Sequence, residues 1–230
     1  MNRPPVVVVT GVPGAGKTTL ARSLADELGA LLVSLDEIKE EMWATGATRD
    51  RAELRRLAEG ELARRLDASR GVVVIDIWVA PSRDTERVAT LVRSHCADPV
   101  EVLCRVPAEV AVRRYARRGR ADGPHLRADE PTLQRIRDAV VALSPLPFGG
   151  RCIEVDTSAP VDARVVADRV KELCRRAAPD PDCAQGTEPF CGRTAFLCGR
   201  VRAFCGRHAV AKKITKSLAA KGLRTRPGVP

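Results

Sequence analysis

Near its N-terminus the chain carries a glycine-rich segment that few folds accommodate, placed directly after four valines and a threonine. The segment reads G-V-P-G-A-G-K-T from Gly11 to Thr18, so four residues separate Gly11 from Gly16, and Lys17 follows. This is the spacing of a phosphate-binding loop, in which glycines let backbone N–H groups converge on an anion. Lys17 is then placed to reach the β- and γ-phosphate oxygens, and the Thr18 hydroxyl to ligate Mg²⁺.

The residues on either side of this loop fit the same interpretation. Val6–Thr10 is a short apolar, β-branched run of the kind that forms a buried parallel strand. After the loop, leucine and alanine recur at helical spacing, and Gly29 follows as a C-cap. We therefore expect nucleotide to be bound by Gly11, Gly14, Ala15, Gly16, Lys17, Thr18 and Thr19.

Further apolar runs alternate with helical patterns along the chain. The runs at 30–34, 71–79, 100–106 and 152–156 predict four more strands, each followed by a helix. This alternation predicts an α/β fold, a doubly wound five-stranded parallel sheet of the P-loop nucleoside-triphosphate hydrolase and nucleotide kinase type. Trp78, within the third of these strands, is predicted to be a core residue rather than a stacking surface.

The 230 residues suffice for one α/β domain and an extension. Residues 179–230 hold ten of the 39 Lys and Arg residues but three of the 29 Asp and Glu residues. We expect a domain over 1–178 and a basic tail over 179–230, largely irregular and disordered, with weak, salt-sensitive attraction to nucleic acid or other polyanions. The absence of a long apolar run or a signal peptide pattern predicts a cytoplasmic protein with no membrane partner.

Two aspartates fall where ligands bind in an open parallel sheet, beyond the carboxyl ends of the strands. Asp36 follows the second strand, where it could accept the proton of an attacking hydroxyl or instead cap a helix that starts at Glu37. Asp76 lies near the end of the third strand. It could hold Mg²⁺, usually through water, or be a buried carboxylate bonded to the phosphate loop.

Arginines cluster in two further places. The first cluster, Arg49, Arg51, Arg55 and Arg56, could contact an anionic substrate or form a solvated helix face. The second lies in a predicted lid over about 113–130 and contains Arg113, Arg114, Arg117, Arg118 and Arg120. A mobile lid there would close over the phosphates and neutralise developing charge.

Residues 5–176 resemble the predicted-kinase, AAA-like group of P-loop kinases, which includes polynucleotide kinase domains, zeta-toxin sugar-nucleotide kinases and chloramphenicol phosphotransferase. The features that carry the resemblance are G-V-P-G-A-G-K-T-T-L, S-L-D-E-I-K, V-V-V-I-D and the arginine-rich segment after V-P-A-E-V. The resemblance implies ATP with Mg²⁺ as donor and Asp36 as the residue that activates the acceptor hydroxyl. It also implies a catalytic lid arginine, for which we take Arg117, with Arg114 and Arg118 binding the cofactor.

The chain departs from polynucleotide kinases after the central aspartate, where Ile77-Trp78 replaces the usual Thr-Asn. No motif identifies the acceptor, so we predict transfer of the γ-phosphoryl of ATP to a hydroxyl of a small-molecule or nucleotide-like substrate. The alternative is an ATP-binding regulatory or nucleic-acid-associated module without acceptor turnover. A GTPase is excluded because Asn2 is the only asparagine, so no Asn-Lys-x-Asp motif exists.

Overall fold

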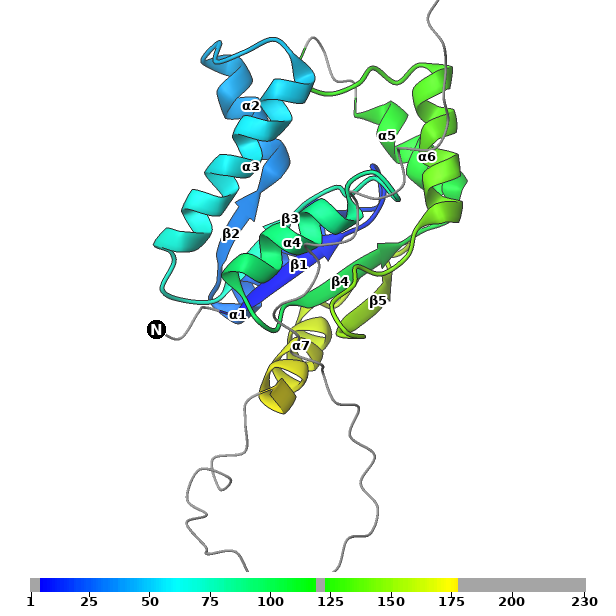
Figure 1. Ribbon diagram of the computed structural model, residues 1–230. Helices are drawn as coiled ribbons and strands as arrows, with labels where there is room; N and C mark the ends of the chain where they lie inside the picture. Colours follow the sequence, from blue (N-terminus) through cyan, green and yellow to red (C-terminus); the bar gives the residue numbers. More distant parts are fainter. Residues whose placement is uncertain (1–4, 119–122, 178–230) are drawn as a thin grey trace, which may run out of the picture. The chain divides into compact units, whose positions relative to one another are not determined.

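The computed structural model describes residues 5–118 and 123–177, which form a five-stranded parallel sheet flanked by helices (Figure 1). The strands are β1 (Val6–Thr10), β2 (Leu31–Ser34), β3 (Val73–Asp76), β4 (Val100–Arg105) and β5 (Cys152–Asp156). They lie in the order β2-β3-β1-β4-β5, and every neighbouring pair is parallel. The predicted doubly wound α/β sheet is thereby confirmed.

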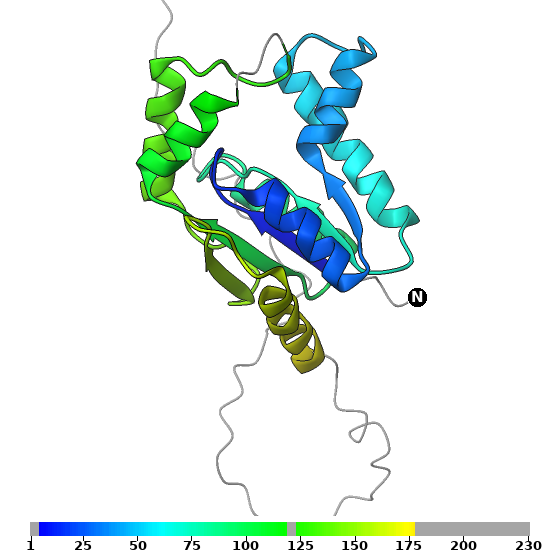
Figure 2. The same ribbon diagram turned by 180° about the vertical axis from the view of Figure 1, so that it is seen from behind.

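Helices cover both faces of the sheet. They are α1 (Lys17–Leu28), α2 (Leu35–Ala44), α3 (Arg51–Ala68), α4 (Thr85–His95), α5 (Ala108–Arg117), α6 (Glu130–Ala142) and α7 (Ala163–Ala177). One core cluster joins the sheet to α1, α5 and α7, and the other joins it to α2, α3 and α4. Figure 1 shows α4 in front of the sheet, and Figure 2 shows α1 in front when the molecule is seen from behind.

The central strand β1 explains why the valine run is continuous rather than alternating. Val7 and Val9 pack into the first core cluster, whereas Val6 and Val8 pack into the second. Because both faces of the strand are covered, every position favours an apolar, β-branched side chain. The run therefore places the phosphate-binding loop at the centre of the carboxyl edge of the sheet.

Two local boundaries differ from the sequence prediction. Strand β3 ends at Asp76, although the apolar pattern continues to Val79, so residues 77–80 form the irregular connection that follows the strand. Helix α2 begins at Leu35, and the Ser34 hydroxyl accepts a hydrogen bond from the Glu37 amide at 3.4 Å. Ser34 is the N-cap, so the interpretation of Asp36 as an N-cap was wrong, and Asp36 lies in the first helical turn.

The predicted tail over 179–230 and the lid residue Arg120 lie outside the described residues. The domain boundary at 178 therefore stays a prediction. Within residues 5–118 and 123–177, no helix combines the length and the apolar character needed to cross a bilayer.

Candidate active site

The loop between β1 and α1 folds closely against its surroundings. Gly14 and Gly16 have φ of 84° and 86°, a left-handed region that favours glycine. A Cβ on Gly14 would lie 2.2 Å from the Ala111 carbonyl oxygen, and one on Gly11 would lie 2.7 Å from the Cys104 carbonyl oxygen. The loop thus needs glycine for its backbone angles and for its contact with α5 and β4.

Two variants separate these requirements. Gly16→Ala should lower the free energy of unfolding by about 1 to 2 kcal/mol through the positive φ alone, because Arg114 and Thr157, the nearest residues to its Cβ position beyond its chain neighbours, lie 3.9 Å away. Gly14→Ala carries the same backbone penalty and should cost about 1 to 3 kcal/mol more through overpacking. Urea unfolding of both variants measures the difference. Equal destabilisation by the two substitutions would contradict the close packing of Gly14 on α5.

The predicted nucleotide-binding residues of the loop occupy different environments. The Ala15 carbonyl accepts a hydrogen bond from the Thr157 hydroxyl at 2.6 Å, which ties the loop to the end of β5. Lys17 is 8% exposed, and its Nζ donates to the Val12 carbonyl at 3.2 Å. Thr19, by contrast, is exposed on α1.

The two residues predicted to bind Mg²⁺ are hydrogen-bonded to each other. The Thr18 hydroxyl donates to Asp76 Oδ2 at 2.7 Å, and the Ser34 hydroxyl donates to the same oxygen at 3.3 Å. Asp76 is only 3% exposed, at the end of the central strand pair β1 and β3. Hydroxyl and carboxylate oxygens beside a phosphate-binding loop are the donors that Mg²⁺ takes in phosphoryl-transfer sites. This donor set therefore fits Mg²⁺.

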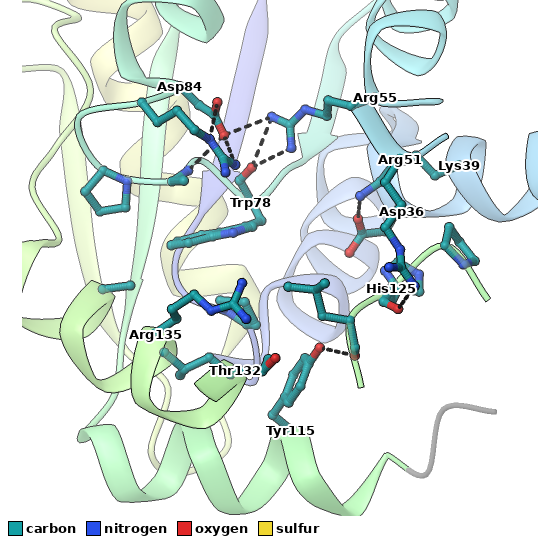
Figure 3. A pocket seen from close by; sticks show the side chains of 18 of the residues that line it. Asp36, Lys39, Arg51, Arg55, Trp78, Asp84, Tyr115, His125, Thr132 and Arg135 are labelled. Carbon is teal, nitrogen blue, oxygen red and sulfur yellow. Dashed lines mark hydrogen bonds and ion pairs between the residues drawn. The ribbon is translucent and has the colours of Figure 1, made fainter. Parts of the chain in front are cut away.

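A cavity of about 1000 Å³ extends from the loop across the carboxyl edge of the sheet (Figure 3). Lys17 and Thr18 line one end, and residues of α3, α6, the segment 78–84 and the segment 124–126 line the rest. Its charged lining residues are nine Lys and Arg and four Asp and Glu. The excess positive charge makes the cavity attractive to anions, including polyphosphates.

Asp36 lines this cavity beside Lys39, as Figure 3 shows. Lys39 Nζ lies 2.5 Å from Asp36 Oδ1, and the Asp36 side chain is 36% exposed. Removal from water would raise the pKa of the Asp36 carboxyl, but attraction to Lys39, His125 and Lys17 outweighs this and holds the pKa well below its usual range. Asp36 is therefore a carboxylate at neutral pH, in the same cavity as the phosphate-binding loop.

An ionic network around two buried carboxylates, Glu59 and Asp84, lines part of the cavity. Glu59 bonds to Arg55 and to Arg87, and Asp84 bonds to Arg87 at 2.8 Å and to Arg83 at 2.9 Å. These residues come from α3, α4 and the segment between β3 and α4. The spacing of Arg55 and Glu59 indicates a helical pair, but no sequence pattern indicates that α4 completes the network.

The buried carboxylate of this network gives a pH-dependent prediction. Burial would raise the pKa of Asp84, but its hydrogen bond from Arg83 and attraction to Arg55 outweigh burial and lower this pKa below its usual range. A carboxylate with a lowered folded-state pKa stabilises the fold above its unfolded pKa, and this stabilisation is lost as the pH falls through the folded-state pKa. Asp84→Asn should cost about 3 kcal/mol of unfolding free energy at neutral pH, and the difference from wild type should shrink below about pH 4.

Urea unfolding at neutral and at acid pH measures this difference. The control is Asp98→Asn, since Asp98 pairs with Arg151 at 3.1 Å while its side chain is 60% exposed. That substitution should cost less than about 1 kcal/mol. A cost for Asp84→Asn that stays constant down to the acid limit would contradict the ionic role of Asp84.

The predicted substrate arginines divide into two groups. Arg51, Arg55 and Arg56 line the cavity. Arg49 instead lies over the Trp43 ring, 4.7 Å from its centroid, and is not among the cavity-lining residues. Arg55 is held within the ionic network, whereas Arg51 Nη2 donates to the His125 carbonyl at 3.3 Å.

The predicted lid arginines also separate. Arg114 donates to the Thr157 and Ser158 carbonyls, both at 2.8 Å, and its Nη1 lies 3.9 Å from the position of a Cβ on Gly16. It therefore sits beside the phosphate loop and outside the cavity lining. Arg113, Arg117 and Arg118 are all exposed, and of these three only Arg118 lines the cavity.

The segment 124–126 crosses the cavity between α2, α3 and α5. His125 Nε2 lies 2.7 Å from Glu40 Oε1, and the Tyr115 hydroxyl donates to the Leu126 carbonyl at 2.7 Å. Sequence reasoning gave no role to Tyr115 or His125. No sequence pattern indicates either contact, because Glu40 lies 85 residues from His125 and Leu126 lies 11 residues from Tyr115, beyond the end of its helix.

The prediction that Trp78 is a core residue was wrong. Its side chain is half-buried, packs partly against the first core cluster and lines the cavity. The reason is the early end of β3 at Asp76, which places Trp78 in the irregular connection beyond the strand, where the cavity lies. Thr132 and Arg135, also missed, lie three residues apart on α6 and hence on one helix face.

Comparisons with known proteins agree with this geometry. A family model described as AAA domain matches residues 6–143. Shikimate kinase of Corynebacterium efficiens is 32% identical over 174 residues, covering 74% of this chain and 96% of that protein. Cytidylate kinase of Aeropyrum pernix is 39% identical over 137 residues, covering 56% of this chain and 72% of that protein. The crystal structure of a candidate kinase from Chloroflexus aurantiacus, 27% identical, has a TM-score of 0.60 and covers 75% of this chain and 99% of its own.

Proposed function

The chain belongs to the AAA-domain family and to the P-loop kinases within it, and from that premise we propose that it transfers the γ-phosphoryl group of ATP to a hydroxyl of a small-molecule or nucleotide-like acceptor. The observation that carries this proposal is a juxtaposition within one cavity. The phosphate-binding loop, the bonded pair Thr18 and Asp76, and the Asp36 carboxylate all face the same space or border it directly.

In the proposed mechanism, the loop amides and Lys17 hold the β- and γ-phosphates of ATP. Thr18 and Asp76 would hold Mg²⁺, which neutralises charge on the phosphates when it is bound. Arg118 contributes positive charge from the cavity wall, and Arg114 lies where the loop meets β5. Most of the catalysis is then positioning and charge stabilisation.

Asp36 receives the acceptor hydroxyl in this proposal. Lys39 engages Oδ1, and the acceptor O–H donates to Oδ2. As the acceptor oxygen bonds to the γ-phosphorus and the bond to the β-phosphate oxygen breaks, the hydroxyl proton passes to the Asp36 carboxylate.

The position of Asp36 favours a hydroxyl over a phosphate as the acceptor. A phosphate acceptor is already ionised at neutral pH, so it needs no base, and an adjacent carboxylate would repel it. The relatives named for shikimate and for cytidylate support a small-molecule acceptor but differ in its chemistry.

The test is acceptor-dependent formation of ADP. The purified chain is incubated with ATP and Mg²⁺, alone and with nucleosides, hydroxylated ring acids, sugars, nucleoside monophosphates and oligonucleotides with a free hydroxyl at the 5′ end. We expect stimulation by at least one hydroxyl acceptor. ATP binding without stimulated turnover across the panel would favour an ATP-binding regulatory module instead.

A further inference from the structure

Glu101 is a buried carboxylate that the proposed mechanism does not use. It is the second residue of β4, it is 1% exposed, and its neighbours along the strand are apolar. We propose that Glu101 is a positioning residue for nucleotide binding, which acts through Thr10 to set where the phosphate-binding loop lies relative to the α6 side of the cavity. This inference rests on the nucleotide-binding part of the proposed function.

The two carboxylate oxygens of Glu101 hold different segments of the chain. Oε1 accepts a hydrogen bond from the Thr10 hydroxyl at 2.5 Å, and Oε2 accepts one from the Leu146 amide at 2.6 Å. The Cys152 thiol of β5 also donates to this carboxylate. Because all three partners are donors, the position suits a group that only accepts hydrogen bonds, and an ionised carboxylate is such a group.

A charge at this position is unfavourable unless its contacts compensate for burial. Burial raises the pKa of Glu101 above its usual value, although the three hydrogen bonds and attraction to Arg105 oppose this rise. Arg105 itself pairs with Glu154 at 2.9 Å, so hydrogen bonds are the main compensation. An apolar residue would fit this strand at lower cost. The role of Glu101 therefore lies in the segments that its oxygens hold.

Thr10 connects this carboxylate to the phosphate-binding loop. It is the last residue of β1, and the backbone passes from it directly into Gly11. A Cβ on Gly11 would lie 2.7 Å from the Cys104 carbonyl oxygen, so this end of the loop already lies close to β4. Just beyond it, the Val12 carbonyl accepts the hydrogen bond from Lys17 Nζ. We therefore expect a change in the orientation of Thr10 to displace the residues that face the phosphates.

Leu146 connects the same carboxylate to α6. It lies in the segment that follows this helix, and α6 contributes Thr132, Arg135 and other residues to the lining of the cavity. Arg105 Nη1 donates to the Leu143 carbonyl at 3.0 Å, so β4 holds the same segment at a second point. The carboxylate thus joins the base of the phosphate-binding loop to the end of a helix that forms one wall of the cavity.

A small cavity shows that close packing does not fix the spacing of these two segments. Its volume is about 10 Å³, room for about one water molecule, and its lining includes Thr10, Gly11, Glu101, Leu143 and Leu146. The base of the loop and the segment after α6 are therefore not in continuous contact here. Their spacing depends on the hydrogen bonds of the carboxylate rather than on van der Waals contact.

The test measures binding of a nucleotide rather than transfer. A non-hydrolysable ATP analogue with Mg²⁺ is titrated calorimetrically into the full chain and its variants, and thermal unfolding establishes that each variant is folded. Glu101→Gln keeps the shape but places an amide N–H₂ group where a donor already points. We expect it to bind the analogue about tenfold more weakly than wild type does. An affinity within about threefold of wild type would overturn the inference.

Two variants of Thr10 test whether Glu101 acts through this residue. Thr10→Val has a similar shape but no hydroxyl, so it should weaken binding as Glu101→Gln does, whereas Thr10→Ser keeps the hydroxyl and should bind as wild type does. Combining Glu101→Gln with Thr10→Val should weaken binding no further, because both substitutions interrupt one contact. Additive losses, or equal affinities of the two Thr10 variants, would contradict the proposal. The Thr10 pair decides the question even where Glu101→Gln does not fold.

Val92→Ala is the control for lost stability. Val92 is buried in the second core cluster, on α4, and is not among the residues that line the cavity. Its substitution should lower the unfolding temperature and leave the affinity for the analogue unchanged. A weakening as large as that in Glu101→Gln would overturn the inference, because general destabilisation would then explain both.

The same titrations separate this inference from the proposed function. Wild-type protein that does not bind the analogue would reject both. Binding that is equally tight in wild type and in Glu101→Gln would reject this inference alone. Binding that depends on Glu101, without transfer to any acceptor of the panel, would reject the proposed function alone.

Discussion

Lys17→Met should reduce acceptor-dependent ADP formation by at least about a hundredfold. Lys17 is buried beside the loop, and within the described residues no carboxylate forms an ion pair with it. Its charge is therefore available to the transferred phosphoryl group, where charge stabilisation in a site removed from bulk water is largest. Methionine keeps an unbranched side chain of similar length but removes the charge.

The control is Lys171→Met, which removes a lysine that is 51% exposed and pairs with Asp168 at 3.7 Å. That variant should keep wild-type turnover. Thermal unfolding of Lys17→Met establishes that the fold persists. Turnover by a folded Lys17→Met within about fivefold of wild type, a loss far below that expected for a removed donor, would contradict the assigned role.

Asp36→Asn should retain ATP binding and lose about a hundredfold to ten-thousandfold in transfer. The substitution preserves shape but removes the carboxylate that the proposal gives to the acceptor proton. ATP contacts depend on the loop, Lys17 and Thr18, so the affinity for ATP should change little. Competition with a bound ATP analogue measures the affinity for ATP, and single-turnover kinetics measure the rate of transfer, so the two effects are separated.

The neighbouring Glu37 supplies the control for this prediction. It pairs with Arg22 at 2.7 Å on the surface, where both side chains are well exposed. Glu37→Gln should leave both binding and transfer unchanged, because exposed pairs contribute little. Equal losses in Asp36→Asn and Glu37→Gln would show that helix α2, rather than the Asp36 carboxylate, is being perturbed.

The parts of the site predicted from sequence are those set by local patterns. The glycine spacing of the loop predicts a backbone that only glycine tolerates, and Gly14 has the positive φ and the close contact that such a loop requires. The valine run predicts a buried parallel strand, and the two core clusters confirm that both of its faces are covered. Thr18 and Asp76 fall together because parallel strands end at one edge of the sheet.

The parts that were missed depend on where the chain leaves regular structure. The apolar residues of the run 71–79 do not indicate that β3 ends at Asp76, so Trp78 was predicted to be in the core. The contacts of Arg114 with the Thr157 and Ser158 carbonyls could not be read from the sequence either, and its role at the phosphates stays a prediction. The partners of Glu59 lie on two helices, and a contact between helices leaves no periodic signal in one sequence.

The most direct test of the central claim is where the γ-phosphate of ATP goes. Phosphorus nuclear magnetic resonance can follow the reaction of the purified chain with ATP, Mg²⁺ and each hydroxyl acceptor of the panel. The account predicts that the γ-phosphate signal is replaced by that of a phosphomonoester on the acceptor, together with ADP, and that Asp36→Asn slows this conversion. Consumption of ATP that yields only inorganic phosphate, with every acceptor recovered unchanged, would contradict it.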